Sequence, residues 1–115
     1  MCSNPPVEGV RAVTCRLDTI EFDLQAVTPD EVGGAQTQSR LVDQVRTIRQ
    51  SVDAAGAPGT PRARRKFKRA GRQLQAFMKA VARGQKRGKI APGIAETVLT
   101  SAGDVKARIL PFQKP

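Results

Sequence analysis

The chain has 115 residues, with 20 Lys and Arg against 10 Asp and Glu, no His, two Cys, and Phe as its only aromatic residue type. The absence of His removes the commonest general base and metal ligand, and two Cys cannot complete a four-ligand zinc site, so we expect no enzyme, metal site or cofactor. The length suits a single domain, residues 1–115, with a core of Val, Leu, Ile and Ala.

The first predicted helix covers residues 8–27. Its apolar residues recur at alternating steps of three and four, which is the spacing of one helix face and not of a strand. These residues are Val10, Val13, Leu17, Ile20, Leu24 and Val27. Asn4, Pro5 and Glu8 suit a helix entry. Residues 28–34 contain Pro29 and end in two glycines, which predicts a short connector.

The second and third predicted helices cover residues 39–55 and 61–86. We expect Thr37 or Ser39 to cap the second helix, and Thr60 to cap the third, in front of a first-turn proline. The Ala, Gly and Pro residues at 54–59 end the second helix. Its apolar stripe consists of Leu41, Val45, Ile48, Val52 and Ala55. The stripe of the third helix consists of Phe67, Ala70, Leu74, Phe77, Met78 and Val81.

The fourth predicted helix covers residues 92–110. We expect Glu96 in its first turn, Lys106 and Arg108 in its last turn, and Pro111 as its stop. Its apolar stripe consists of Ile94, Val98, Ala102, Val105 and Ile109. Helices of this kind with short connectors bury their stripes only against one another. The sequence therefore predicts an all-α fold, an antiparallel bundle of about four amphipathic helices.

Residues 54–95 contain no Asp or Glu and carry twelve of the 20 Lys and Arg residues. On a helical wheel most of these cations lie opposite the apolar stripe, so they form a candidate polyanion-binding face. The candidate residues are Arg64, Arg65, Lys68, Arg69, Arg72, Lys79, Arg83, Lys86 and Arg87. A merely solvated helix face is the other interpretation of the same pattern. We expect Asp18, Glu21 and Asp23 on the first helix to neutralise part of this face, and not to act as a catalytic pair.

Several partners would suit such a face: an anionic polymer, an anionic surface or a nucleic acid. The basic segment has no exposed aromatic residue for base stacking, and it lacks helix-turn-helix, zinc-finger and RNP motifs, so nucleic acid is the less favoured partner. No stretch reaches the roughly 18 apolar residues that span a bilayer. Residues 1–6 lack the pattern of a signal peptide, and we expect the chain to be part of a larger protein.

Cys2 and Cys15 lie 13 residues apart. If the first helix begins near Val10, the preceding segment can fold back and a disulfide is feasible. If it begins at Pro5, about 15 Å of helix separates the two residues and they cannot easily meet. Two reduced cysteines are the alternative.

Residues 66–109 contain a pattern that resembles the FIMAH domains, small helical modules appended to secreted bacterial enzymes and surface proteins. The similar positions are the segment 73–77 (QLQAF), Val81, the segment 88–92 (GKIAP), Ala95, Leu99 and Ala102. The resemblance implies an extracellular or cell-surface accessory domain without catalytic residues. It also favours the Cys2–Cys15 disulfide, because such bonds persist in oxidising compartments.

Together these observations predict a non-catalytic accessory or interaction module of a secreted or cell-surface bacterial protein, in contact with anionic envelope surfaces. The alternative is a small basic protein of the cytoplasm that binds nucleic acid through the helix face between Arg62 and Lys89.

Overall fold

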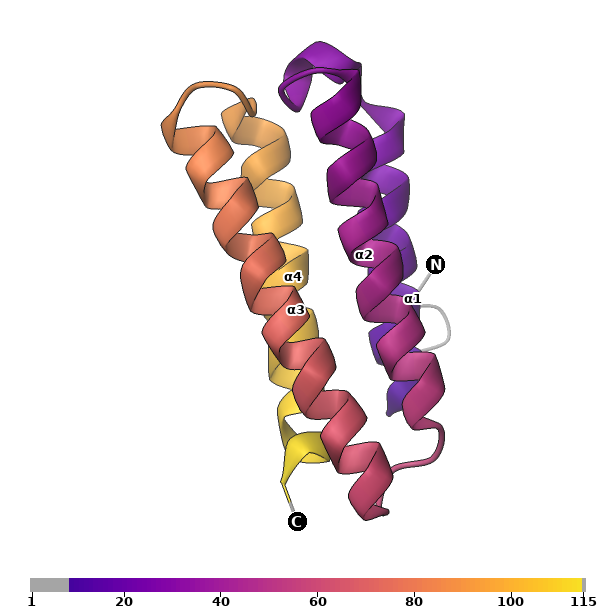
Figure 1. Cartoon of the computed structure of the whole chain (residues 1–115). Coiled ribbons are helices and arrows are strands. Elements are labelled where there is room, and N and C mark those ends of the chain that lie inside the picture. Colours follow the sequence, from indigo (N-terminus) through magenta and orange to yellow (C-terminus); the bar gives the residue numbers. More distant parts are fainter. Residues whose placement is uncertain (1–8, 115) are drawn as a thin grey trace.

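The computed structural model describes residues 9–114, which form four α-helices and one short 3₁₀ helix (Figure 1). These elements are α1 (Val10–Ala26), η1 (Pro29–Glu31), α2 (Ala35–Ala55), α3 (Pro61–Lys86) and α4 (Pro92–Gln113). Within residues 9–114 the only extended pairing is an isolated bridge between Val32 and Ile90. The predicted all-α fold is confirmed.

Consecutive helices run in opposite directions, and each packs against the next along the chain (Figure 1). The last helix, α4, returns to pack against α1 and so closes a four-helix bundle. In this ring α3 has α2 and α4 as its sequential neighbours, whereas α1 lies diagonally across from it. At about 1.5 Å per residue, α3 is about 39 Å long, close to the longest dimension of the molecule, 42 Å.

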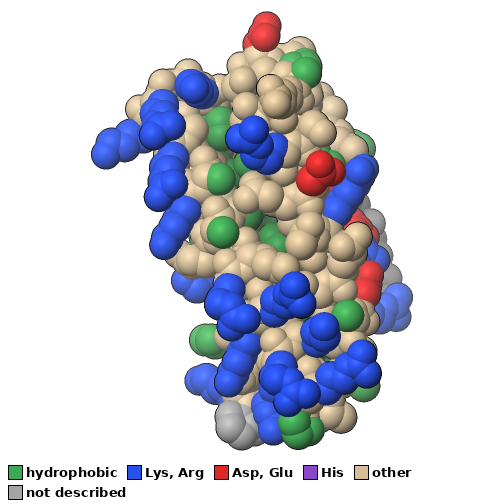
Figure 2. Space-filling model, viewed as in Figure 1, with side chains coloured by type: hydrophobic (Ala, Val, Ile, Leu, Met, Phe, Trp, Pro, Cys, Tyr) green, Lys and Arg blue, Asp and Glu red, His purple; other side chains and the backbone are tan. Residues whose placement is uncertain are grey.

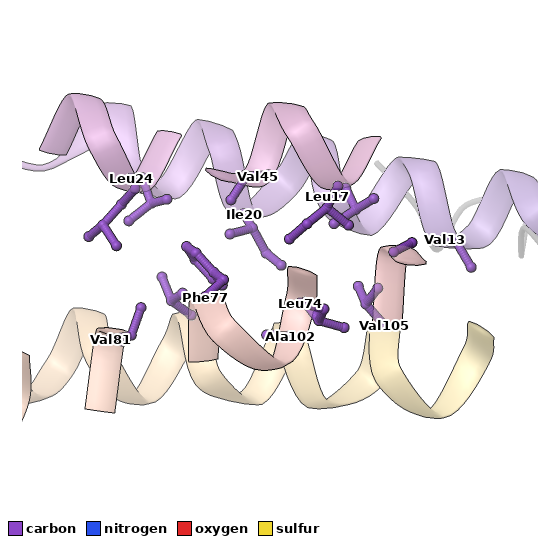
Figure 3. Close-up of a cluster of buried hydrophobic side chains, with 14 of the residues drawn as sticks. Val13, Leu17, Ile20, Leu24, Val45, Leu74, Phe77, Val81, Ala102 and Val105 are labelled. Atoms are coloured by element: carbon purple, nitrogen blue, oxygen red, sulfur yellow. The ribbon is translucent and has the colours of Figure 1, made fainter. Parts of the chain in front are cut away.

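The predicted apolar stripes meet along the axis of the bundle. Figure 3 shows Leu17 and Ile20 of α1 pointing toward Leu74 and Phe77 of α3 across the centre. All four side chains are almost completely buried. Burial of a Leu, Ile or Phe side chain stabilises the folded state by about 1.5–3 kcal/mol each, so these contacts dominate the cohesion of the bundle.

The edges of the stripes differ from the prediction. Met78 and Ile94 are only partly buried and pack against the margin of the core. Ala12, Ala63 and Ala95 are completely buried instead, although the spacing did not single them out. Alanine is small enough to lie where two helices approach closely. Because it is only weakly hydrophobic, a spacing pattern does not distinguish a buried alanine from an exposed one.

Some of the predicted helix boundaries agree with the structure and others differ. The α3 helix spans the expected residues, and the Thr60 side chain caps it by accepting a hydrogen bond from the backbone N–H of Ala63 at 3.0 Å. The α4 helix begins at the expected proline. The α2 helix starts four residues before the expected position, with Gly34 as its N-cap residue, so Thr37 and Ser39 lie inside the helix and do not cap it.

The beginning of α2 is held by a side chain that also completes the end of α1. The Gln38 amide donates hydrogen bonds to the carbonyl oxygens of Leu24 and Val27, at 2.7 and 3.1 Å. The last carbonyls of a helix have no partner within the helix, and this contact supplies one. The α1 helix begins at Val10, two residues later than expected, and ends at Ala26, one residue earlier than expected. The predicted entry at residues 4–8 lies outside the described residues.

Pro111 does not stop the last helix, because α4 continues to Gln113. Proline removes one backbone hydrogen bond, but the final turn is retained by packing. The Phe112 ring lies against the buried Phe67 ring of α3, with 5.1 Å between the ring centroids. Since the helix extends further than predicted, Lys106 and Arg108 lie before its last turn. Glu96 lies after the first turn even though the helix begins where expected, because it is the fifth residue of the helix.

The connector between α1 and α2 and the connector between α3 and α4 pack together at one end of the bundle. The backbone N–H of Ala91 donates to the carbonyl of Glu31 at 2.7 Å, next to the bridge between Val32 and Ile90. Both bridge residues are buried. Gly84 lies so close that a Cβ atom at this position would stand 2.4 Å from Ile90 Cδ1. This end of the bundle is therefore closely packed.

Candidate polyanion-binding surface

The predicted basic residues lie on the outer side of α3 and just beyond its end. Eight of the nine are exposed, and Arg64 is half-buried. Figure 2 shows Lys and Arg side chains along the edge of the molecule formed by α3 and gathered at its lower end, near the α2–α3 connector of Figure 1. We call the Lys and Arg residues between Arg62 and Lys89 the basic face. The predicted concentration of positive charge is present on one surface.

The carboxylates of α1 do not neutralise the basic face, so that expectation is wrong. Asp18 pairs with Arg49 of α2, and Glu21 lies 3.4 Å from Arg46 of the same helix. Asp23 takes part in no ion pair within residues 9–114. The reason is the order of helices around the bundle: α1 lies beside α2 and α4, and diagonally across from α3.

The ion pairs instead connect the other helices. Asp104 of α4 accepts from Arg16 of α1 and from Arg108 one turn further along α4. In the described part of the chain, no ion pair includes a Lys or Arg of the basic face. The positive charge of α3 is therefore left for solvent, counterions or a ligand.

Three groups have shifted pKa values, and all three lie away from α3. Partial burial would raise the pKa of Asp104, but the hydrogen bonds from Arg108 and Arg16 outweigh it and hold this pKa below its usual range. Partial burial would lower the pKa of Arg49, but Asp18 and Asp53 raise it. Partial burial raises the pKa of Asp23. The shifts of Asp104 and Arg49 arise from ion pairs of the scaffold, whereas that of Asp23 arises from partial burial alone.

The basic face is divided by an uncharged stretch at residues 73–78. Gln73 and Ala76 from this stretch face a groove of about 620 Å³ between α3 and α2. From α2 the groove is lined by Gln36, Ser39, Arg40, Asp43, Gln44 and Thr47. The side-chain oxygen of Gln44 is buried there without a hydrogen-bond partner among the described residues. This groove is mostly neutral, and the cations of the basic face precede and follow it along α3.

Two smaller hollows flank the end of α3 that is richer in cations. Lys66 and Arg69 face the hollow on the α2 side, where the Ser51 hydroxyl donates to Gln73 at 2.8 Å. Lys68 and Arg72 face the hollow on the α4 side, which also includes Lys106, Gln75 and Gln113. The candidate residues named from the sequence included neither Lys66, which belongs to the basic face, nor Lys106 of α4. Only the packing of α4 against α3 shows that Lys106 lies beside the basic face.

Other kinds of site find little support among the described residues. Residues 9–114 hold no cluster of three or more His, Cys, Asp or Glu residues that could bind a metal ion. None of the described helices is long and apolar enough to cross a membrane. Cys15 lies on α1 and is half-buried, whereas Cys2 lies outside the described residues, so their disulfide stays a prediction.

No model of a known protein family, no characterised protein and no solved structure matches this chain. The function is therefore inferred from the surface itself.

Proposed function

We propose that this chain is a non-catalytic helical module of a secreted or cell-surface bacterial protein, and that it binds anionic envelope polymers through the basic face. The observation that carries the proposal is the absence, within residues 9–114, of any carboxylate paired with the Lys and Arg residues of α3. The FIMAH-like pattern of residues 66–109 supports the accessory role and the extracytoplasmic location.

The unpaired charge has a physical consequence. Neighbouring cations on one helix repel each other, and a polyanion relieves this repulsion while it releases its own condensed counterions. The ion pairs that hold α1 to α2 and α4 do not compete for the ligand, because they use other residues. A polymer can therefore bind along α3 without disturbing the scaffold.

A pair of charge-matched variants tests the proposal. R69Q/R83Q removes two exposed cations from α3, and R11Q/R40Q removes two exposed cations from α1 and α2 that form no ion pair within residues 9–114. Both variants have the same net charge. We expect R69Q/R83Q to weaken the binding of soluble poly(glycerol phosphate) at least fivefold more than R11Q/R40Q does. Equal weakening would mean that overall charge, and not the basic face, governs binding.

Nucleic acid is the second candidate, because α3 is long enough to lie along one turn of duplex DNA, about 34 Å. Phe67 and Phe77 are buried, so α3 offers no aromatic side chain for base stacking, and contact would be limited to phosphates. A fluorescent DNA duplex therefore belongs in the same assay. Tighter binding of the duplex than of poly(glycerol phosphate) at physiological salt would favour this second function.

A further inference from the structure

The hollow between α3 and α4 gathers three cations from two helices. Its volume is about 330 Å³, and Lys68, Arg72 and Lys106 line it without any carboxylate. Lys68 and Arg72 are one helical turn apart and therefore lie on the same side of α3. Lys106 comes from the facing side of α4. This is the one hollow described in which cations from two different helices converge.

An exposed hydrogen bond directs the Lys106 side chain toward the hollow. Its ammonium group donates to the side-chain oxygen of Gln75 on α3, with 3.1 Å between the atoms. An ammonium group has three N–H donors, so two remain for a ligand. The contact holds the charge at the hollow, where an unrestrained lysine on α4 would extend into solvent. Gln113 adds a further side-chain amide at the same place.

Gly71 lines this hollow beside Gln113. A Cβ atom at position 71 would lie 2.7 Å from the amide nitrogen of Gln113, so the glycine makes room for that amide against α3. Glycine is the least favourable residue in the middle of a helix after proline. Its presence here, one residue before Arg72, lets the side-chain amide of Gln113 approach the backbone of α3.

We infer that this hollow is a discrete binding site for a phosphate group, and the inference rests on the function proposed above. Three positive groups and two amides around one small volume suit a tetrahedral anion with several acceptor oxygens. The Arg72 guanidinium can bind two oxygens at once, whereas each lysine supplies a point charge. The remaining cations of α3 then guide the polymer, and this hollow fixes one of its phosphate groups.

Titration of the ¹⁵N-labelled chain with inorganic phosphate tests the site directly, with sodium chloride used to keep the ionic strength constant. We expect chemical-shift changes concentrated at the backbone amide of Gly71 and at the side-chain amides of Gln75 and Gln113. Shift changes distributed evenly along α3, or none at these three residues, would overturn the inference.

Two charge-matched pairs provide the comparison. K68Q/K106Q removes both lysines of the hollow, and R11Q/R40Q removes two exposed cations that lie outside the basic face. Each change lowers the net charge by the same amount. We expect inorganic phosphate to bind K68Q/K106Q at least tenfold more weakly than wild type, and R11Q/R40Q within about twofold of wild type. An equal loss in both variants would contradict a discrete site.

A second variant changes the shape of the hollow without changing its charge. G71A places a methyl group 2.7 Å from the Gln113 amide nitrogen and so displaces this amide, whereas G103A adds a methyl group to α4 with nothing within 4 Å. We expect phosphate binding to fall severalfold in G71A and to stay unchanged in G103A. Unchanged binding in G71A would contradict the role of the Gln113 amide in this site.

The source of the phosphate, a polymer or a lipid headgroup, requires separate probes. Soluble poly(glycerol phosphate) and vesicles of phosphatidylglycerol in phosphatidylcholine distinguish them. We expect K68Q/K106Q to bind the polymer more weakly than wild type does, and to bind the vesicles with the same affinity as wild type. Polymer binding that is unaffected in K68Q/K106Q overturns this inference and leaves the proposed function standing. Phosphate shifts at the hollow without polymer binding overturn the proposed function alone.

Discussion

Gly84 provides a sharp test of the packing between α3 and the connector that follows it. A Cβ atom at position 84 would lie 2.4 Å from Cδ1 and 2.7 Å from Cγ1 of Ile90, both far closer than atoms can approach. Ile90 is only 3% exposed, so its side chain cannot simply move into solvent. Alanine gains at most about 1 kcal/mol over glycine inside a helix, and Gly84 lies in the last turn of α3, whereas overpacking a buried contact costs about 1–3 kcal/mol.

We therefore expect G84A to lower the free energy of unfolding by about 1 kcal/mol, despite the better helix propensity. Gly103 is the matched control, because it also lies inside a helix and a Cβ atom there meets nothing within 4 Å. G103A should raise the free energy of unfolding by about 0.5–1 kcal/mol. Urea denaturation followed by circular dichroism measures both variants.

A double-mutant cycle of G84A and I90A separates the steric clash with Ile90 from the change in helix propensity. In I90A the nearest remaining side-chain atom, Cβ, lies 3.6 Å from the added methyl group, which is ordinary contact. The I90A change itself should cost about 2–4 kcal/mol through the cavity it leaves. In that background G84A should become stabilising, as G103A is. If G84A stabilises the wild-type chain as much as G103A does, the close contact between Gly84 and Ile90 described above is contradicted.

Three further outcomes are expected. L74A should lower the free energy of unfolding by about 2–4 kcal/mol, because Leu74 is completely buried; a change near zero in urea denaturation would contradict its place in the core. The pKa of Asp104 is lowered, so its ion pairs stabilise the fold above the ordinary Asp pKa of about 4, and this stabilisation is lost as pH falls through the lowered value. D104N should therefore lose less stability than wild type between about pH 5 and pH 2, and identical acid curves would refute this. Thiol counting in denaturant without reductant should find no free thiol if Cys2 and Cys15 are bonded, and two if they are reduced.

The core was predictable because burial in a bundle imposes the spacing of a helix face on the sequence. Leu17, Leu74 and Phe77 are large, recur at that spacing, and are buried as expected. The start of α2 was not predictable in the same way, because Gly34 precedes it without a capping side chain. The prediction that Pro111 ends the last helix was wrong, because the final turn is retained by contact between Phe112 and Phe67 of α3. The spacing of residues within one helix does not reveal such a contact.

The basic residues of α3 could be identified from composition alone, but their environment could not. Which carboxylates meet which arginines depends on the order of helices around the bundle, and no spacing within one helix encodes this order. Asp18 therefore pairs with α2, contrary to expectation. The order of helices also places Lys106 beside the basic face, because α4 packs against α3 and Gln75 accepts the hydrogen bond of Lys106.

The most direct test of the central claim, that the basic face binds anionic polymers, is the salt dependence of binding to soluble poly(glycerol phosphate). The slope of log affinity against log salt concentration counts the phosphates that are neutralised, at about 0.7 per contact for a flexible strand. R69Q/R83Q should reduce the slope by about 1.4, whereas R11Q/R40Q should leave it unchanged. Equal slopes for the two charge-matched variants would contradict the account, because they would show that binding does not depend on where the charge lies.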